Sequence, residues 1–375
     1  MKCKFTKYCG GCKNVNDDYN LTLESKQKYI NEVFKDICVP NRVVANYYPY
    51  KYRNKLQLAF TELKGKTLVG FFEEGSIRVA DIDGCILNGD YSFVVIKIIR
   101  EYMSRFKIRP YAFGSGILRY LHARCIDNKI QLTLCVTTDN FAGRNWLLDK
   151  LQENFDEVSL YLNINRRTDR AIFDNQFKFV GGTKYLNFEM CGVKVSIEPA
   201  SFLQVNLKIA EKMYKSALEN LELKDTTTVV DLYSGIGITS IMFSKKCKNV
   251  IAIEENKRAV GNAIQMAKLN SVHNINFYVG KCEENLDKLT QMDDIVVFVD
   301  PARNGLEKSV IQKILLLKPR KIVYMSCNPE TCVRDIKLLL SDNNYQVSDI
   351  TPYDMFAFAN HIEILTVLDR MWLVN

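Results

Sequence analysis

The chain has 375 residues, of which 47% are hydrophobic and 25% are charged, and its formal net charge at pH 7 is +8. This length allows two domains with separate cores, and no apolar run approaches the roughly 18 residues that a membrane-spanning helix needs. The first residues show no signal-peptide pattern, so we expect a cytoplasmic protein without a membrane partner. The positive charge favours a polyanionic partner.

The cysteine and histidine counts restrict the chemistry further. The chain has twelve cysteines, which are not expected to form a disulfide framework in the reducing cytosol. Its three histidines are too few for a zinc site built on several imidazoles. Acid–base chemistry therefore falls mostly to carboxylates.

Four of the cysteines predict a metal site that begins at the N-terminus. Cys3, Cys9 and Cys12 lie within the first twelve residues, and Gly10-Gly11 between the last two let the backbone wrap around a metal centre. Cys85 is the best fourth ligand. Four thiolates without a nearby histidine fit either a [4Fe–4S] cluster or a zinc ion. The spacing favours the cluster but leaves zinc, or an uncoordinated set, open.

The segment 19–37 carries apolar residues at helical spacing, and short β-rich segments follow from residue 47 to about residue 202. We therefore expect an N-terminal region at 1–200, in which residues 1–14 and 47–200 are β-rich and residues 15–46 form a helical connector. Three basic clusters lie in the β-rich part. They are Lys51, Arg53 and Lys55; Arg105, Lys107 and Arg109; and Arg166, Arg167 and Arg170.

Aromatic residues accompany these basic clusters, among them Tyr50, Tyr52 and Tyr120. Basic and aromatic side chains together suit phosphate contact and base stacking. Each cluster by itself could equally be a solvated strand edge. Taken together with the positive net charge, the clusters favour a region that recognises RNA.

From residue 201 onward the pattern alternates between strand and helix. Ser201 or Asn206 is expected to cap a helix at 207–221. Further helices are expected from residue 238 and around 259–267, between apolar strands at 229–233, 250–254, 275–279, 295–300, 322–325 and 364–368. Repeated βα units predict an α/β fold, with a Rossmann-like, mostly parallel sheet and helices on both faces, as a C-terminal domain at 201–375.

A glycine-rich turn follows the first strand of this predicted sheet. Gly235 lets the backbone approach a nucleotide-like ligand, and Glu254, at the end of the next strand, can accept hydrogen bonds from ribose hydroxyls. The dinucleotide fingerprint is not met, because no third glycine follows Gly237. With Asp231 before it, the turn looks more like the S-adenosylmethionine loop of class I methyltransferases.

Asp300 ends the fourth strand in the sequence Asp-Pro-Ala-Arg. Many nucleic-acid methyltransferases that act on amino groups carry a second proline and an aromatic residue at this place. Both are missing here, so amine methylation is disfavoured. Asp300 is then expected to orient the donor or the substrate.

Cys327 follows the next strand, directly before Asn328-Pro329, and Glu363 precedes the last strand. Ligands of such sheets bind at the carboxyl ends of the strands, so the thiol is well placed to act as a nucleophile. This pair suits methylation at carbon 5 of a pyrimidine. Addition of the thiolate to carbon 6 makes carbon 5 nucleophilic, and a base then removes the carbon 5 proton. The alternative for Cys327 is an ordinary small core residue.

Together, several motifs resemble those of the RNA uracil-5-methyltransferases, over nearly the whole chain. They are Asp231-Leu-Tyr-Ser-Gly-Ile-Gly, Asp300-Pro-Ala-Arg, Ser326-Cys-Asn-Pro with Thr331 and Arg334-Asp335, Asp354-Met-Phe, His361-Ile-Glu, Ser201-Phe-Leu-Gln-Val-Asn, Gly116-Ile-Leu-Arg-Tyr-Leu, Tyr52-Arg-Asn-Lys and the four cysteines. The resemblance implies that Cys327 is the nucleophile and Glu363 the base. It also implies that S-adenosylmethionine contacts Gln204, Tyr233, Glu254 and Asp300, beside the turn at Gly235.

The cysteine set resembles that of the branch with a [4Fe–4S] cluster, which acts mainly on 23S ribosomal RNA. We therefore expect a monomer that binds this RNA. The alternatives are the same chemistry on transfer RNA and a non-catalytic iron–sulfur RNA-binding protein.

The sequence departs from the family pattern in three places. The small β-barrel RNA-binding module that precedes the cluster in many members is not found before Cys3. Ile238 and Lys281 occupy donor-site positions that are often polar or acidic, which leaves their roles open. Ala357-Phe-Ala-Asn replaces the proline and threonine usual before the His-Val-Glu motif, although Glu363 keeps its place.

Overall fold

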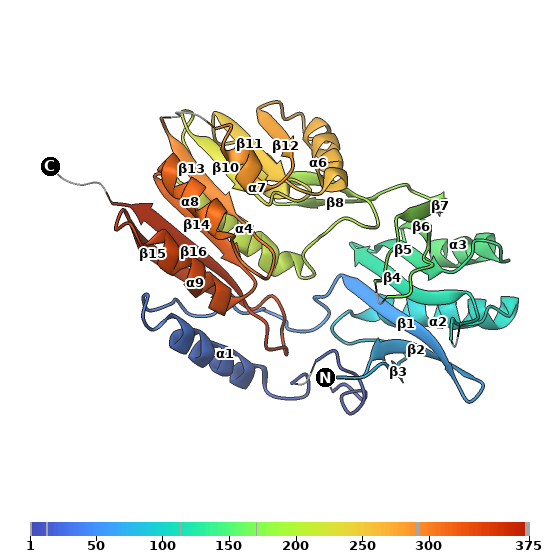
Figure 1. The fold of residues 1–375 in the computed structure, drawn as a ribbon. Coiled ribbons are helices and arrows are strands. Elements are labelled where there is room, and N and C mark those ends of the chain that lie inside the picture. The colour runs from blue at the N-terminus through green and yellow to red at the C-terminus, as the bar shows by residue number, and fades with distance from the viewer. Residues whose placement is uncertain (1, 13, 113, 170, 290–292, 372–375) are drawn as a thin grey trace.

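A computed structural model describes residues 2–12, 14–112, 114–169, 171–289 and 293–371. These residues contain two seven-stranded sheets and one separate hairpin. Figure 1 shows the two sheets at opposite ends of the molecule, with the C-terminal sheet and its helices in yellow to red and the N-terminal sheet in blue to green. Among the described residues, no helix is long and apolar enough to cross a membrane.

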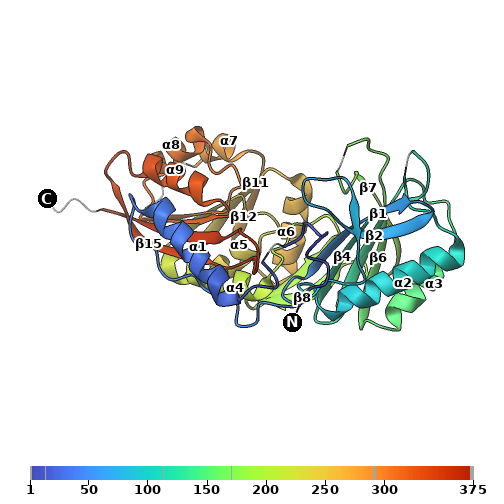
Figure 2. The same cartoon turned by 90° about the horizontal axis from the view of Figure 1, so that it is seen from below.

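The N-terminal sheet has the strand order β3-β2-β1-β4-β5-β6-β7. Its neighbours are antiparallel except β5 and β6, which are parallel and are connected through α3. Helices α2 and α3 pack on one face of this sheet, as Figure 2 shows, and bury the apolar side chains of that face. The elements are β1 (Lys55–Leu63), β2 (Lys66–Phe72), β3 (Val79–Asp81), α2 (Asp90–Phe106), β4 (Leu118–Ile126), β5 (Lys129–Val136), α3 (Arg144–Gln152), β6 (Glu157–Ile164) and β7 (Gln176–Gly182).

The C-terminal sheet has the order β12-β11-β10-β13-β14-β16-β15. The first five of these strands are parallel, and β16 runs antiparallel to both of its neighbours. The elements are α4 (Leu207–Leu221), β10 (Thr228–Leu232), α5 (Ile238–Ser244), β11 (Asn249–Glu254), α6 (Lys257–Leu269), β12 (Ile275–Val279), α7 (Cys282–Leu286), β13 (Ile295–Val299), α8 (Lys308–Leu317), β14 (Lys321–Ser326), α9 (Pro329–Leu339), β15 (Tyr345–Tyr353) and β16 (Glu363–Arg370).

Helices cover both faces of this sheet, which confirms the predicted α/β architecture of the C-terminal half. One face packs against α4, α5 and α6, and the other against α7, α8 and α9. Because both faces are covered, successive residues of the central strands are apolar, as in Val229-Val230 and Val296-Val297, each of which is fully buried. The carboxyl ends of the parallel strands are left as the place where polar side chains gather.

Two elements from before residue 201 also pack on the C-terminal sheet. Helix α1 (Tyr19–Phe34) buries Ile30 and Phe34 in the core beside α9, and the hairpin of β8 (Leu186–Met190) and β9 (Val193–Ile197) lies in the core with α4 and α6. Both sides of residue 200 therefore build this core. The division into domains at that residue stays a prediction.

Candidate active site and thiol cluster

Cys327 and Glu363 come together because β14 and β16 are antiparallel neighbours. Ser326 pairs with Ile364 at the end of this ladder, and the register carried one residue further sets Cys327 opposite Glu363. Residues directly opposite each other in an antiparallel pair have Cα atoms about 4.5–5.5 Å apart. The strand pairing thus brings the predicted thiol and the predicted carboxylate close together at the carboxyl end of β14.

Local sequence holds Cys327 between a strand end and a helix start. The Oγ atom of Ser326 accepts a hydrogen bond from the backbone N–H of Asn328 at 3.2 Å. The side chain of Asn328 in turn caps α9 by accepting from the N–H of Glu330 at 3.2 Å, and Pro329 occupies the first turn of that helix. Cys327 itself is partly exposed, so its thiol can reach a ligand.

Four ionisable groups at this edge are close enough to affect one another. Burial raises the pKa of Asp231 and of Asp300 to about 7, and the charge of Asp231 adds to the shift of Asp300. Burial and the charge of Asp300 raise the pKa of Glu363 to about 8. Burial, Glu363 and Asp300 raise the pKa of the Cys327 thiol to about 11. The site therefore holds a neutral thiol beside a carboxyl group that titrates near physiological pH.

The glycine-rich turn is built as the sequence requires. Gly235 has φ of 55°, a left-handed conformation that favours glycine, and its N–H donates a hydrogen bond of 3.0 Å to Oε2 of Glu254. The N–H of Asn256 donates to Oε1 of the same carboxylate at 2.7 Å. Tyr233, which precedes the turn, also has a positive φ of 63°. These contacts fix the Glu254 carboxylate at the end of β11.

One carboxylate oxygen of Asp231, near the end of β10, has no hydrogen-bond partner among the described residues. Oδ2 of Asp231 accepts hydrogen bonds from Thr239 and Ser240, whereas its buried Oδ1 accepts none. A buried carboxylate oxygen without a partner costs free energy unless it is protonated or meets a donor or cation. The turn thus fits a ligand that brings a cationic or hydrogen-bond-donating group to the end of β10.

The other predicted donor-site positions differ in their surroundings. Gln204 is 8% exposed, and its backbone oxygen accepts a hydrogen bond of 2.9 Å from Nδ2 of Asn54, which ties the start of β1 to this region. Asn206, not Ser201, caps α4 through a hydrogen bond from the N–H of Ile209. Ile238 is buried in the core, and Lys281 is exposed at the N-cap of α7.

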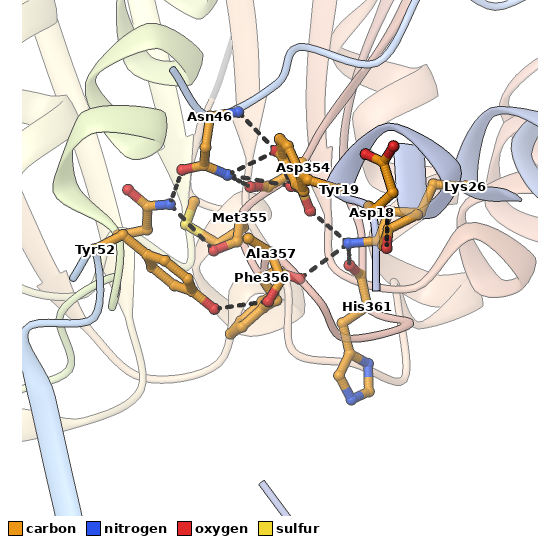
Figure 3. Close-up of polar contacts among 12 residues, drawn as sticks. Asp18, Tyr19, Lys26, Asn46, Tyr52, Asp354, Met355, Phe356, Ala357 and His361 are labelled. Carbon is orange, nitrogen blue, oxygen red and sulfur yellow. Dashed lines mark hydrogen bonds and ion pairs between the residues drawn. The ribbon is translucent and has the colours of Figure 1, made fainter. Parts of the chain in front are cut away.

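The loop between β15 and β16, which leads to Glu363, is held by helix α1, as Figure 3 shows. Lys26, 5% exposed, donates hydrogen bonds to the Asp354 carboxylate, to the backbone oxygen of Phe356 at 2.9 Å and to that of His361 at 3.0 Å. The hydroxyl of Tyr19 donates to the other oxygen of Asp354. All three donors of the Lys26 ammonium are therefore used on this one loop.

Sequence reasoning missed this network. Lys26 lies on the helix face that also carries Thr22, Ile30 and Phe34, each four residues from the next, and all four are buried. A lysine in line with the apolar residues of a helix is the signal that could have revealed it.

The predicted RNA-contacting residues are divided between the interior and the surface. Tyr50 packs on the ring of Phe358 at 5.1 Å between centroids, and the hydroxyl of Tyr52 donates to the backbone oxygen of Ala357 at 3.2 Å. Both tyrosines therefore brace the loop that leads to Glu363. Tyr120 instead lines a cavity on the N-terminal sheet. Arg170 lies outside the described residues.

Cys3, Cys9, Cys12 and Cys85 line one cavity of about 140 Å³. Burial raises the pKa of the Cys12 thiol to about 12 and also raises those of Cys9 and Cys85, and nearby thiols of the set add to each shift. The structure thus brings the four thiols together. It does not show a metal site, because in the part of the chain that it describes no group of three or more His, Cys, Asp or Glu side chains is arranged to hold a metal ion.

The sequence matches a known protein family and bacterial relatives. The family model described as tRNA (uracil-5-)-methyltransferase matches residues 18–371. An uncharacterized RNA methyltransferase of Listeria innocua is 31% identical over 376 residues, which cover 98% of this chain and 83% of that protein. An uncharacterized RNA methyltransferase of Fusobacterium nucleatum is 33% identical over 373 residues, which cover 96% and 80%.

A solved structure resembles the whole chain. It is the tRNA (uracil-54, C5)-methyltransferase of Pyrococcus abyssi in complex with S-adenosyl-L-homocysteine, with a TM-score of 0.82 and 26% identity over 98% of this chain and 86% of that one. This structural match agrees with the sequence matches to the family model and to the two relatives. The chain is an enzyme that belongs to the tRNA (uracil-5-)-methyltransferase family of S-adenosylmethionine-dependent RNA methyltransferases.

Proposed function

We propose that this protein transfers a methyl group from S-adenosylmethionine to carbon 5 of a uridine in 23S ribosomal RNA. The observation that supports the chemistry best is the placement of Cys327 opposite Glu363 at the carboxyl edge of the C-terminal sheet. Carbon 5 of uracil is too weak a nucleophile to take a methyl group by itself. A thiol and a base at one point provide what this acceptor lacks.

The proposed reaction is a covalent one. The Cys327 thiolate adds to carbon 6 of a uracil that has been flipped into the site, and the electrons of the C5–C6 double bond move toward the carbonyl at carbon 4. Carbon 5 takes the methyl group from the sulfonium sulfur of S-adenosylmethionine, which is left as S-adenosyl-L-homocysteine. Glu363 then accepts the carbon 5 proton, the C5–C6 double bond returns, and the bond from carbon 6 to sulfur breaks to release the thiolate. Glu363 finally passes its proton to solvent.

The donor would lie at the carboxyl ends of β10, β11 and β13. Glu254, held by the N–H groups of Gly235 and Asn256, is placed to accept hydrogen bonds from ribose hydroxyls. Asp231 and Asp300 would stabilise the positive charge of the donor. Gln204 and Tyr233 complete the proposed donor set.

Transfer RNA is the second candidate substrate. It is favoured by the likeness to an enzyme whose name specifies uracil-54 of transfer RNA. Ribosomal RNA is favoured by the four cysteines, which resemble those of the branch that acts mainly on 23S ribosomal RNA. Mass spectrometric mapping of 5-methyluridine in both RNAs, with and without the gene, decides between them, since the proposal requires the loss of a site in 23S ribosomal RNA.

We also propose that Cys3, Cys9, Cys12 and Cys85 hold a [4Fe–4S] cluster. A zinc ion needs its four sulfur atoms at about 2.3 Å from one point, whereas a cluster spreads its ligands around several irons. The four thiols line one cavity of about 140 Å³, and the resemblance of the cysteine set to that of the cluster-bearing branch favours the second arrangement. The protein is proposed to act as a monomer in the cytoplasm.

A trapping experiment tests the chemistry. With RNA that contains 5-fluorouridine, carbon 5 carries no proton for Glu363 to remove, so the methylated adduct should stay attached to Cys327 and shift the protein on a denaturing gel. Cys327→Ala should form no adduct and transfer no methyl group. Cys38→Ala, a change at another half-exposed cysteine, is the control and should behave like the native protein. Methylation by Cys327→Ala would contradict the covalent mechanism.

A further inference from the structure

The N-terminal sheet has a cavity on the face that α2 and α3 leave free. Ala59 of β1 and Tyr120 of β4 pair across the ladder and belong to this face, whereas Leu58 and Leu121 point into the core under α2. A cavity of about 660 Å³ lies here. The turn between β2 and β3 and the segment at Tyr111 form its walls.

Two charged residues line this cavity: Asp169, which is ion-paired with Arg167, and Arg119, which is held rigidly. The side chain of Arg119 is 8% exposed, and its Nη1 donates hydrogen bonds to the backbone oxygen of Asn165 at 3.1 Å, to Oδ1 of Asn165 at 2.8 Å and to the backbone oxygen of Arg167 at 2.6 Å. Its guanidinium lies over the ring of Tyr111 at 5.1 Å and over that of Tyr120 at 5.7 Å. All three of these hydrogen bonds to described residues come from Nη1.

Large apolar side chains remain exposed at the rim. Phe72 is 40% exposed and Ile77 is 72% exposed, and both line the cavity. Aromatic faces beside a fixed guanidinium are the combination that binds an unpaired nucleotide, because the rings stack on the base and the arginine meets the phosphate or a base oxygen. A net charge of +8 agrees with a polyanionic occupant.

We propose that this cavity binds an unstacked nucleotide of the RNA substrate, away from the uridine that is methylated. The inference rests on the proposed function, since it takes RNA as the substrate. Strand β1 connects the two places: Asn54, just before it, bonds to Gln204 beside the donor site, and Ala59 and Thr61 lie further along it. At about 3.3 Å per residue the cavity is roughly 15–25 Å from that contact. It is therefore too distant to hold the target base, and suits a nucleotide a few positions away.

Binding of a single-stranded RNA tests this site in the full-length protein. The probe is a fluorescent 12-nucleotide RNA of mixed sequence, and its dissociation constant is measured by anisotropy at fixed salt. The variant Phe72→Ala with Tyr111→Ala should bind roughly 5- to 150-fold more weakly, the range expected from loss of base stacking. Phe179→Ala is the matched control, because Phe179 is 43% exposed and lies on β7 at the other edge of the same sheet.

The trapping reaction with 5-fluorouridine RNA is run alongside. If the native protein forms the adduct and all variants bind the probe equally, the second nucleotide site is refuted while the proposed function stands. If the double variant binds weakly but the native protein forms no adduct, the proposed function fails and the nucleotide site stands. Arg119→Gln, which removes the positive charge, should weaken binding and reduce its salt dependence.

Discussion

Lys26 of helix α1 and Asp354, which follows β15, form a buried ion pair across 328 residues of sequence. Lys26 is 5% exposed and Asp354 is fully buried. The same ammonium donates hydrogen bonds to the backbone oxygens of Phe356 and His361. His361 lies two residues before Glu363. On its other side the loop packs Ala357 and Phe358 against the cysteine cavity. The segment leading to the proposed base is therefore set by α1 and by the four-cysteine region together.

Lys26→Met should destabilise the protein by roughly 3 to 5 kcal/mol, because it leaves Asp354 buried without its cation. The turnover number should fall as the loop loosens. Adding Asp354→Asn should restore part of the stability, since no buried charge then stays unpaired. Lys35→Met changes an exposed lysine next to the C-terminus of the same helix and should leave the melting temperature unchanged. Thermal unfolding and steady-state methylation measure both effects, and equal behaviour of the two variants would contradict a positioning role for Lys26.

Glu363→Gln should accumulate the covalent adduct on ordinary RNA. The glutamine keeps the shape of the side chain but cannot take the carbon 5 proton, so the methylated uracil stays attached to Cys327. We expect a protein–RNA band on a denaturing gel with unmodified RNA, and turnover reduced by at least about 100-fold. A variant that turns over normally, or that forms no adduct at all, would show that another group is the base.

The rate should rise with pH through the neutral range. Glu363, whose pKa is about 8, and Cys327, whose pKa is about 11, both act in their deprotonated forms. Each loses its proton as the pH rises, and each deprotonated fraction grows by roughly 50- to 100-fold between pH 6 and pH 8. Because both groups are required, kcat/KM for RNA, which reports the free enzyme, should increase by roughly 1,000-fold or more over this range. A flat profile over this range, measured at low RNA concentration, would contradict these two assignments.

Burial of Glu363 should lower the free energy of unfolding at high pH, where its carboxyl group is ionised. Its pKa in the folded protein, about 8, lies above the ordinary value of 4.5. The stability that it contributes as a neutral acid is thus fully present below about pH 4 and is lost as the pH rises through 8. Glu363→Gln should therefore be more stable than the native protein at pH 9, by roughly 3 to 5 kcal/mol, and nearly equal to it at pH 4. Chemical denaturation at the two pH values gives the difference, and an equal gain at both would point to packing instead.

The cysteine proposal predicts a brown protein with about four irons per chain when it is purified without oxygen. Replacing Cys3, Cys9, Cys12 or Cys85 singly by serine should lower the iron content and the visible absorbance. Cys38→Ser should change neither, since Cys38 lies outside the cavity. Iron and zinc analysis settles the point, and one zinc per chain with no iron would refute the cluster.

Much of the C-terminal half could be predicted from local pattern. The helix at 207–221 with Asn206 as its cap, the strand at 275–279 and the break at Asn328-Pro329 all occur where the residues required them. Caps, prolines and apolar runs act within a few residues of themselves, so they can be recognised in a single sequence. The local pattern failed for a strand in which buried and exposed residues do not alternate regularly. Strand β15 was not expected.

By itself the sequence determined which groups carry the chemistry: a thiol before Asn-Pro, a carboxylate before the last strand, a glycine turn and four cysteines. Only the tertiary structure decided how they meet. The insertion of β16 between β14 and β15 sets Cys327 opposite Glu363, and Lys26 reaches Asp354 from the other end of the chain. Strand order and buried ion pairs depend on contacts between distant segments, whose free energy no local pattern records.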